Sequence, residues 1–213
     1  MNLTRFPVNP FVELTYILWT GDGGDAIVVD PGMKAAAERD EVVQFLDSHR
    51  LTLRHILLTH LHIDHVASAA WMAQRYNLPI EGGQADEALG ALLPKQAEHF
   101  RIGIELNPLK LDRYLSQGDT LTLGDEEIRV LEVPGHSPGS LAYYVPTSNF
   151  VLSGDTLFSG SIGRTDLPGG DFGILVKAIN DKLMTLPADT MVYPGHNRET
   201  TIGDELRYNP FIN

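Results

Sequence analysis

Short apolar runs and amphipathic stretches alternate along the first quarter of the chain. Residues 11–19 and 26–30 are rich in β-branched and aromatic side chains, and a Gly-Asp-Gly-Gly segment at 21–24 separates them, so they predict a β-hairpin. Residues 35–48 place apolar side chains at helical spacing among acidic ones, which predicts a helix. The apolar run at 56–58 predicts a buried strand.

Three further elements follow before residue 101. Residues 66–76 predict a helix, and residues 79–80 begin a short strand. Residues 85–100 have a helical composition, but Pro94 should interrupt the helix because proline lacks the backbone N–H and clashes with the preceding turn.

The pattern changes to short strands from residue 114 to residue 151. Residues 172–186 then predict an amphipathic helix, and residues 190–193 predict a last strand. The predicted strands between Gly, Pro, Asp, Ser or Asn turns are 121–123, 128–133, 141–145 and 150–152.

The order of these elements predicts the fold class. Strands that segregate in this way favour two sheets packed face to face with helices outside, an α/β protein of the four-layer αββα sandwich type. A doubly wound parallel sheet is the alternative, and the hairpins at 114–152 argue against it. No internal repeat, low-complexity tract or linker divides the chain, so we expect a single domain over residues 1–213.

Composition and charge narrow the classes of function. The absence of cysteine removes disulfides, thiolate metal sites and cysteine nucleophiles. A formal net charge of −12 repels nucleic acid and anionic membranes, so we expect neither as a partner. No apolar run approaches the roughly 18 residues of a membrane span, and no apolar signal core opens the chain. We therefore expect a cytoplasmic protein, and no motif indicates an obligate protein partner.

Five of the eight histidines lie in three short segments that each follow a predicted strand. Loops at strand ends are where a rigid scaffold usually presents binding groups. The other histidines, His49, His55 and His99, we expect at the surface or in a supporting role. The candidate metal ligands are His60, His62, Asp64, His65, His136, Asp155 and His196.

The His-x-His-x-Asp-His spacing has a physical rationale. Residues two apart in an extended segment project to the same side, so His60 and His62 can reach one ion. We assign His136 as the third ligand of this first metal. The chain then turns into a helix, which redirects Asp64 and His65 toward a second position. A carboxylate has two oxygens that can face different ions, so Asp155 is the candidate bridge between the two metals. We assign Asp64, His65 and His196 to the second metal.

The motifs around these ligands resemble those of the metallo-β-lactamase superfamily, and within it the short glyoxalase II-like hydrolases. The segments that carry the resemblance are 59–65, 135–140, 153–158 and 194–196, with further matches at 29–32, 163–166 and 209–211. The resemblance implies the αββα fold and a site with two divalent metal ions. Imidazole and carboxylate ligands suit zinc, iron or manganese, and zinc is our first expectation.

The resemblance also bears on the substrate. Longer glyoxalase II enzymes carry an added C-terminal helical domain that binds glutathione, and this sequence stops at Asn213, so we expect a short member without that domain. Arg164 stands where the longer enzyme has a lysine that holds a glutathione carboxylate, and a guanidinium can bind a carboxylate in the same way. The alternative for Arg164 is a structural salt bridge with Asp166 or Asp171. Asp30 is similar to a buried aspartate that supports the ligand loops, and its alternative is a simple Asp-Pro-Gly turn.

The ligand set and the resemblance together predict a metal-dependent hydrolase. We expect a thioester hydrolase of the glyoxalase II, or hydroxyacylglutathione hydrolase, type that uses a metal-bound hydroxide, oriented by Asp64, on a small-molecule thioester. A thiolate leaving group needs little protonation, which fits a site without an evident general acid. One alternative is a mononuclear iron persulfide dioxygenase that would use His60 or a neighbour, His136 and Asp155. Another is a non-enzymatic metal-binding protein.

Overall fold

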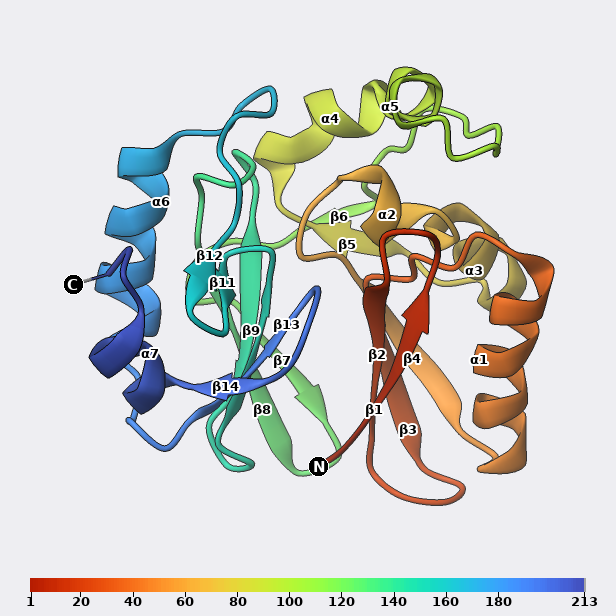
Figure 1. The fold of residues 1–213 in the computed structure, drawn as a ribbon. Helices are drawn as coiled ribbons and strands as arrows, with labels where there is room; N and C mark the ends of the chain where they lie inside the picture. Colours follow the sequence, from red (N-terminus) through yellow and green to blue (C-terminus); the bar gives the residue numbers. More distant parts are fainter. Residues whose placement is uncertain (213) are drawn as a thin grey trace.

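Two six-stranded sheets pack face to face in the computed structural model, which describes residues 1–212 (Figure 1). Asn213, the last residue of the predicted domain, lies outside the described residues. The first sheet has the order β1 (Asn2–Val8), β2 (Glu13–Trp19), β3 (Asp25–Val29), β4 (Thr52–Leu57), β5 (Ile80–Gly82) and β6 (Arg113–Tyr114). The second has the order β14 (Thr200–Thr201), β13 (Met191–Pro194), β10 (Phe150–Gly154), β9 (Leu141–Val145), β8 (Glu126–Glu132) and β7 (Thr120–Leu123), and a separate ribbon pairs β11 (Leu157–Phe158) with β12 (Ser161–Ile162).

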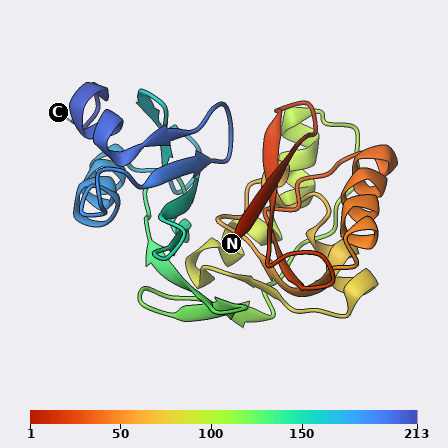
Figure 2. The ribbon, with the colours of Figure 1, turned by 90° about the horizontal axis from the view of Figure 1, so that it is seen from below.

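Helices cover the outer faces of both sheets. Figure 2 shows α1 and α3 outside the first sheet and α6 and α7 outside the second, while α4 and α5 lie at one end of the sandwich in Figure 1. None of the helices within residues 1–212 combines the length and the apolar character that crossing a membrane requires. The helices are α1 (Ala36–Ser48), α2 (Ile63–Val66), α3 (Ala69–Tyr76), α4 (Glu87–Ala91), α5 (Leu93–Phe100), α6 (Phe172–Ala178) and α7 (Ile202–Tyr208), with helical turns η1 (Gln84–Asp86) and η2 (Ile179–Leu183).

This arrangement confirms the predicted αββα fold class. The predicted hairpin is also confirmed, because β2 and β3 pair antiparallel with Tyr16 opposite Val29. Strand β1 was not predicted, since it contains Arg5 and Pro7. It lies at the edge of the first sheet, where a proline can be accommodated because one side of the strand has no partner.

Two predicted helices differ in detail. The helix expected over 66–76 is instead a pair, α2 and α3, and α2 begins at Ile63, so the second half of the histidine motif is already helical. The break in the 85–100 segment falls at Leu92, and Pro94 stands in the first turn of α5. Proline is tolerated there because the first N–H groups of a helix have no partner within it.

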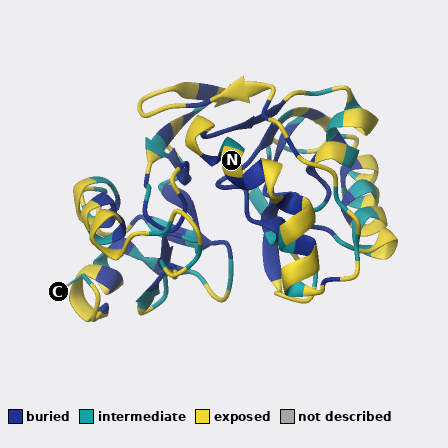
Figure 3. Ribbon diagram, turned by 90° about the horizontal axis from the view of Figure 1, so that it is seen from above, coloured by how far each residue is buried: buried dark blue, intermediate teal, exposed yellow. Residues whose placement is uncertain are grey.

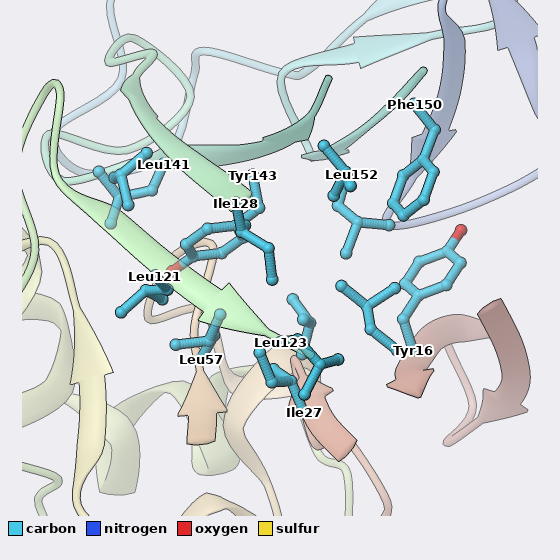
Figure 4. Packing of buried hydrophobic residues seen from close by; sticks show 14 of the residues in the cluster. Tyr16, Ile27, Leu57, Leu121, Leu123, Ile128, Leu141, Tyr143, Phe150 and Leu152 are labelled. Carbon is cyan, nitrogen blue, oxygen red and sulfur yellow. The ribbon is translucent and has the colours of Figure 1, made fainter. Parts of the chain in front are cut away.

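The main core lies between the two sheets. Side chains from both sheets, such as Ile27 and Leu57 from the first and Ile128 and Leu152 from the second, point toward one another in Figure 4 and are almost fully buried. Most of the central strands are buried in Figure 3, whereas the outer faces of the helices are exposed. Polar atoms in this core are bonded across it, since the Tyr143 hydroxyl donates to the carbonyl of Leu58 at 2.7 Å.

Strand direction explains where the candidate ligands gather. Strand β8 runs antiparallel to β9, and β9 runs antiparallel to β10, so β8 and β10 point the same way, and β13 is parallel to β10. The loops that leave β8, β10 and β13 therefore emerge at one edge of the second sheet. Backbone hydrogen bonds hold the first sheet against that edge, because Leu141 N–H donates to Thr59 O just after β4 and Leu14 N–H of β2 donates to Gly195 O.

We predict that Tyr143→Phe lowers the free energy of unfolding by about 1–3 kcal/mol, because the buried carbonyl of Leu58 would lose its cross-sheet donor. Urea unfolding at neutral pH measures the change. The matched control is Tyr144→Phe on the same strand, whose hydroxyl has no hydrogen-bond partner within residues 1–212. Equal losses in the two variants would contradict a role for the Tyr143–Leu58 bond.

Candidate metal centre

The seven candidate ligands meet at the shared edge of the two sheets. Six of them fall into two groups, and within each group the donor atoms lie within 4.8 Å of one another. One group is His60, His62 and His136, and the other is Asp64, His65 and His196.

The first group consists of three converging imidazoles. His62 Nδ1 lies 2.9 Å from His136 Nε2, and His136 Nε2 lies 3.2 Å from His60 Nε2. All three side chains are buried. Three imidazole nitrogens that face one point are a ligand set that zinc and iron accept.

The second group mixes carboxylate and imidazole. His196 Nε2 lies 3.2 Å from Asp64 Oδ2, and His65 Nε2 lies 3.9 Å from the same oxygen. Asp64 and His65 lie in α2, whereas His196 follows β13, so the group joins the two sheets.

Asp155 lies between the groups. Its Oδ1 is 3.4 Å from His65 Nε2, and its Oδ2 is 3.7 Å from His136 Nε2 and 3.6 Å from His196 Nε2. One carboxylate therefore faces nitrogens of both groups. Gly195 permits this approach, because a Cβ at that position would lie 2.4 Å from Asp155 Oδ1 and 2.6 Å from His65 Cε1.

Backbone carbonyls fix the tautomers of two of the histidines. His136 Nδ1 lies 2.8 Å from the carbonyl oxygen of Arg164, and His196 Nδ1 lies 3.2 Å from that of Phe11. A carbonyl can only accept a hydrogen bond, so Nδ1 carries the proton in each ring. In the neutral form of each ring, Nε2 is then unprotonated and faces the cluster, as a metal ligand must.

Asp30 orients one histidine of each group. Its Oδ1 accepts from Thr59 N–H at 2.7 Å, and its Oδ2 accepts from Thr59 Oγ1 at 2.5 Å and from His65 Nδ1 at 2.9 Å. Because the Thr59 hydroxyl donates to Asp30, it accepts from His60 Nδ1 at 3.0 Å. Asp30 is therefore more than a turn residue, and although its oxygens lie near His60 and His65, they are occupied by these bonds.

The charges of the cluster suit a cation. Burial lowers the pKa of His62 to about 3 and holds the pKa of His60 well below its usual value, so both rings are neutral. Burial opposes ionisation of Asp155, but the imidazoles of His65, His196 and His136 together outweigh it and lower the pKa of the carboxyl. The surrounding carboxylates in turn raise the pKa of His65 against the effect of its burial. Carboxylates that stabilise a positive charge on a buried histidine would also stabilise a metal cation at the same place.

Two unpaired buried atoms indicate that the residues of the cluster fit a metal ion. His65 Nε2 and Asp155 Oδ1 have no hydrogen-bond partner in the part of the chain that the structure describes. A buried polar atom without a partner costs about 1–3 kcal/mol. Both atoms face the centre of the cluster, so a metal ion between them would supply the missing partner, and the cluster is able to bind metal ions.

A cavity of about 210 Å³ opens directly above the cluster. Asp64, Asp155 and three of the histidines line its floor. Apart from Arg164, its other walls are apolar, and there the exposed ring of Phe11 meets Phe100 edge to face at a centroid distance of 5.8 Å. The cavity gives a small molecule access to the side of the cluster that faces solvent.

Arg164 lines this cavity but is paired within its own loop. Its Nε and Nη2 donate to the two carboxylate oxygens of Asp166 at 2.7 and 2.6 Å. Asp171 instead caps α6 by accepting from Ile174 N–H. The side chains of Arg164 and Asp166 are 57% and 67% exposed, and exposed ion pairs contribute only about 0–1 kcal/mol, so a substrate carboxylate could replace Asp166.

The remaining histidines lie outside the cluster. His49 Nδ1 contacts the carbonyl of Phe45 at 2.9 Å, and His55 Nδ1 contacts Glu81 at 2.5 Å. His99 is exposed on α5. The expectation that none of the three belongs to the main ligand set agrees with these positions.

Asp86 is a supporting residue that the sequence did not indicate. Its buried carboxylate accepts from Leu61 N–H at 3.0 Å, Gly139 N–H at 2.5 Å and Ser137 Oγ at 2.7 Å. Leu61 stands between two candidate ligands and Ser137 follows a third, so Asp86 joins the loops that carry the first group. An aspartate at the start of a helix suggests only a cap, and its partners are too distant in the sequence to be recognised from it.

The two-sheet sandwich and the histidine–carboxylate cluster at its edge define a class of metal-dependent hydrolases, and comparison with known proteins identifies the family. The sequence model of the metallo-beta-lactamase superfamily matches residues 8–196. The chain belongs to the metallo-beta-lactamase superfamily.

Individual relatives match over their full length. The chain is 36% identical to hydroxyacylglutathione hydrolase GloC of Haemophilus influenzae, over 100% of this chain and 99% of that protein. Among solved structures, the BLEG-1 B3 metallo-beta-lactamase matches with a TM-score of 0.88 and 33% identity, covering 99% of both chains. TTHA1623 in a di-iron-bound form matches with a TM-score of 0.86 and 36% identity, covering 98% of this chain and 99% of that one.

We predict that Asp86→Ala weakens metal binding by about 10–100-fold, the usual effect of removing a partner that orients metal ligands. The loss should fall on metal held by the first group, because Asp86 supports that group alone. Elemental analysis and competition with a chelator measure it. The matched control is Asp112→Ala, which removes a carboxylate that accepts from Ile80 N–H away from the cluster. Unchanged affinity in Asp86→Ala would contradict the role of Asp86.

Proposed function

We propose that this chain is a thioester hydrolase of the glyoxalase II type, which binds two divalent ions and acts on a small acyl-thiol. The observation that carries the proposal is the pair of ligand groups joined by Asp155. Hydrogen-bond acceptors outside the cluster hold the histidine rings so that their other ring nitrogen faces the cluster. The full-length similarity to a hydroxyacylglutathione hydrolase supports the choice of a thioester.

The ligand assignment is part of this proposal. His60, His62 and His136 would hold one ion, Asp64, His65 and His196 the other, and Asp155 would bridge them. Zinc suits this set of imidazoles and carboxylates. Iron is the alternative that the di-iron form of TTHA1623 supports, and manganese is the third candidate.

The side chains above the cluster have separate tasks. Two bound ions would lower the pKa of a shared water toward about 7 and so supply hydroxide at neutral pH. The carboxylate of Asp64 lines the cavity, where it can accept a hydrogen bond from the attacking water and hold it in place. The apolar walls at Phe11, Phe100 and Leu167 restrict access of bulk water to the scissile thioester. The leaving thiolate, with a pKa near 8.5, departs without a dedicated acid.

The test combines metal analysis with a substrate screen. We expect two metal ions per chain and release of free thiol from S-lactoylglutathione. One iron per chain together with oxygen uptake on a persulfide would favour the dioxygenase instead. Hydrolysis of a β-lactam without thiol release would favour the activity of BLEG-1.

We predict that Asp155→Ala binds at most one metal ion per chain and loses more than about 100-fold in thioester hydrolysis, because the bridge contacts both groups. Elemental analysis and a thiol-release assay measure the two effects. The control is Asp189→Ala, which removes an exposed carboxylate near the start of β13. Full occupancy by two ions in Asp155→Ala would refute the bridge assignment.

We predict that Arg164→Ala raises KM about tenfold for glutathione thioesters and little for thioesters of an uncharged thiol, because the guanidinium would bind a carboxylate of the carrier. Asp166→Asn should have the opposite effect on KM, since it frees Arg164 from its ion pair. Steady-state kinetics on both substrates separates the outcomes. An equal rise in KM for charged and uncharged thioesters would mean that Arg164 acts only on the loop structure.

A further inference from the structure

A second cavity, of about 290 Å³, lies beside the one above the metal cluster. Helices α4 and α5 form one side of it, and the loop that carries Leu167 and Pro168 forms the other. The two cavities share His62, Phe100 and Leu167 as lining residues. A molecule whose reacting carbonyl lies over the cluster can therefore extend one arm directly into the second cavity.

The walls of this side pocket are mostly apolar, although His62, Lys95 and His99 also line it. Leu89 and Leu92 of the α4–α5 region face Leu167 and Pro168 of the loop. Gln96 also lines the pocket, but its polar atoms are already used.

The amide of Gln96 is bonded to backbone groups on both sides. Its Oε1 accepts from Ile63 N–H at 3.0 Å, and its Nε2 donates to the carbonyls of Leu89 at 3.0 Å and Leu61 at 3.4 Å. The amide is therefore not available to a polar group of a ligand, and the pocket offers contact mainly to hydrocarbon. The charged Lys95 stands on the exposed face of α5, at the rim.

The two cavities differ in size and in the charge of their lining residues, so they suit different parts of the substrate. An apolar cavity of about 150 Å³ is large enough to hold benzene, so this pocket accommodates a ring or a short hydrocarbon chain. Arg164 lines only the cavity above the cluster, where it suits the anionic carrier of a thioester. The apolar pocket is then left for the other half of the molecule.

We propose that this side pocket binds the acyl group of the substrate, and that the enzyme prefers acyl-thioesters with an apolar acyl chain or ring over those with a short polar acyl group. This inference rests on the proposed thioester hydrolase function. Each methylene buried in the pocket should raise kcat/KM by about fourfold until the pocket is filled.

The test uses glutathione thioesters that differ only in the acyl group, from acetyl through butyryl to hexanoyl. We expect the ratio of kcat/KM for hexanoyl over acetyl to exceed about tenfold. In parallel, calorimetry measures binding of the non-hydrolysable thioethers S-hexylglutathione and S-methylglutathione, with the same order expected. A ratio near one in both measurements would overturn the proposal.

Leu92→Asp places a charge in the pocket and should reduce both ratios to less than about threefold. Leu92 is the N-cap residue of α5, and aspartate is favoured at that position, so the variant should fold. The matched control is Leu206→Asp, which changes a similarly exposed leucine on α7 and should keep the wild-type ratios. Equal loss in both variants would overturn the assignment of Leu92 to the pocket.

Two further outcomes separate this inference from the function on which it rests. Thioester hydrolysis without any dependence on acyl length would refute the pocket and leave the hydrolase intact. Tighter binding of S-hexylglutathione without hydrolysis of any thioester would refute the hydrolase and leave an apolar binding pocket. A preference that follows an alkyl chain on the thiol carrier, at constant acyl group, would show that the pocket holds the leaving group and would overturn the acyl assignment.

Discussion

The buried carboxylate of Asp30 holds the two histidine groups in one arrangement. It accepts from the backbone and hydroxyl of Thr59 and from His65, and through the Thr59 hydroxyl it also fixes the ring of His60. A neutral imidazole can bind a metal only through its unprotonated nitrogen. The hydrogen bond that the other ring nitrogen donates outside the cluster therefore decides which nitrogen is available to the metal. One carboxylate thereby sets the protonation pattern on both sides of the cluster. It does so where β3 ends, in a left-handed backbone conformation with φ of 51°.

The packing of the two sheets determines how the rest of the site is assembled. The loops after β4, β8, β10 and β13 come from both sheets, and each brings at least one candidate ligand to the same edge. Such an edge works only if the loops approach very closely, which explains Gly195 against Asp155 and the carboxylate of Asp86 between two loops. Helices α4 and α5 then close one side of the entrance with apolar side chains. The same contacts thus support the ligands and shape the space above them.

Much of the fold could be predicted because periodicity and turn residues are local properties of the sequence. The hairpin of β2 and β3, helix α1 and the strands of the second half follow their predicted ranges closely. The errors occur where tertiary contacts outweigh local pattern: β1 is an edge strand despite Pro7, and the expected 66–76 helix divides because α2 begins inside the histidine motif. The single domain and the binding of two ions by the seven ligands stay predictions.

The sequence by itself determined the fold class and the chemical character of the site, since the residue types at strand ends do not depend on how the elements pack. It also restricted the ligands to imidazole and carboxylate. Only the tertiary structure decided that Asp86 supports the first group, that Arg164 pairs with Asp166 rather than Asp171, and that Leu92 and Leu167 share an apolar pocket. Most of these contacts join residues that are far apart in the chain. They depend on how sheets, helices and loops approach one another, which no local pattern encodes.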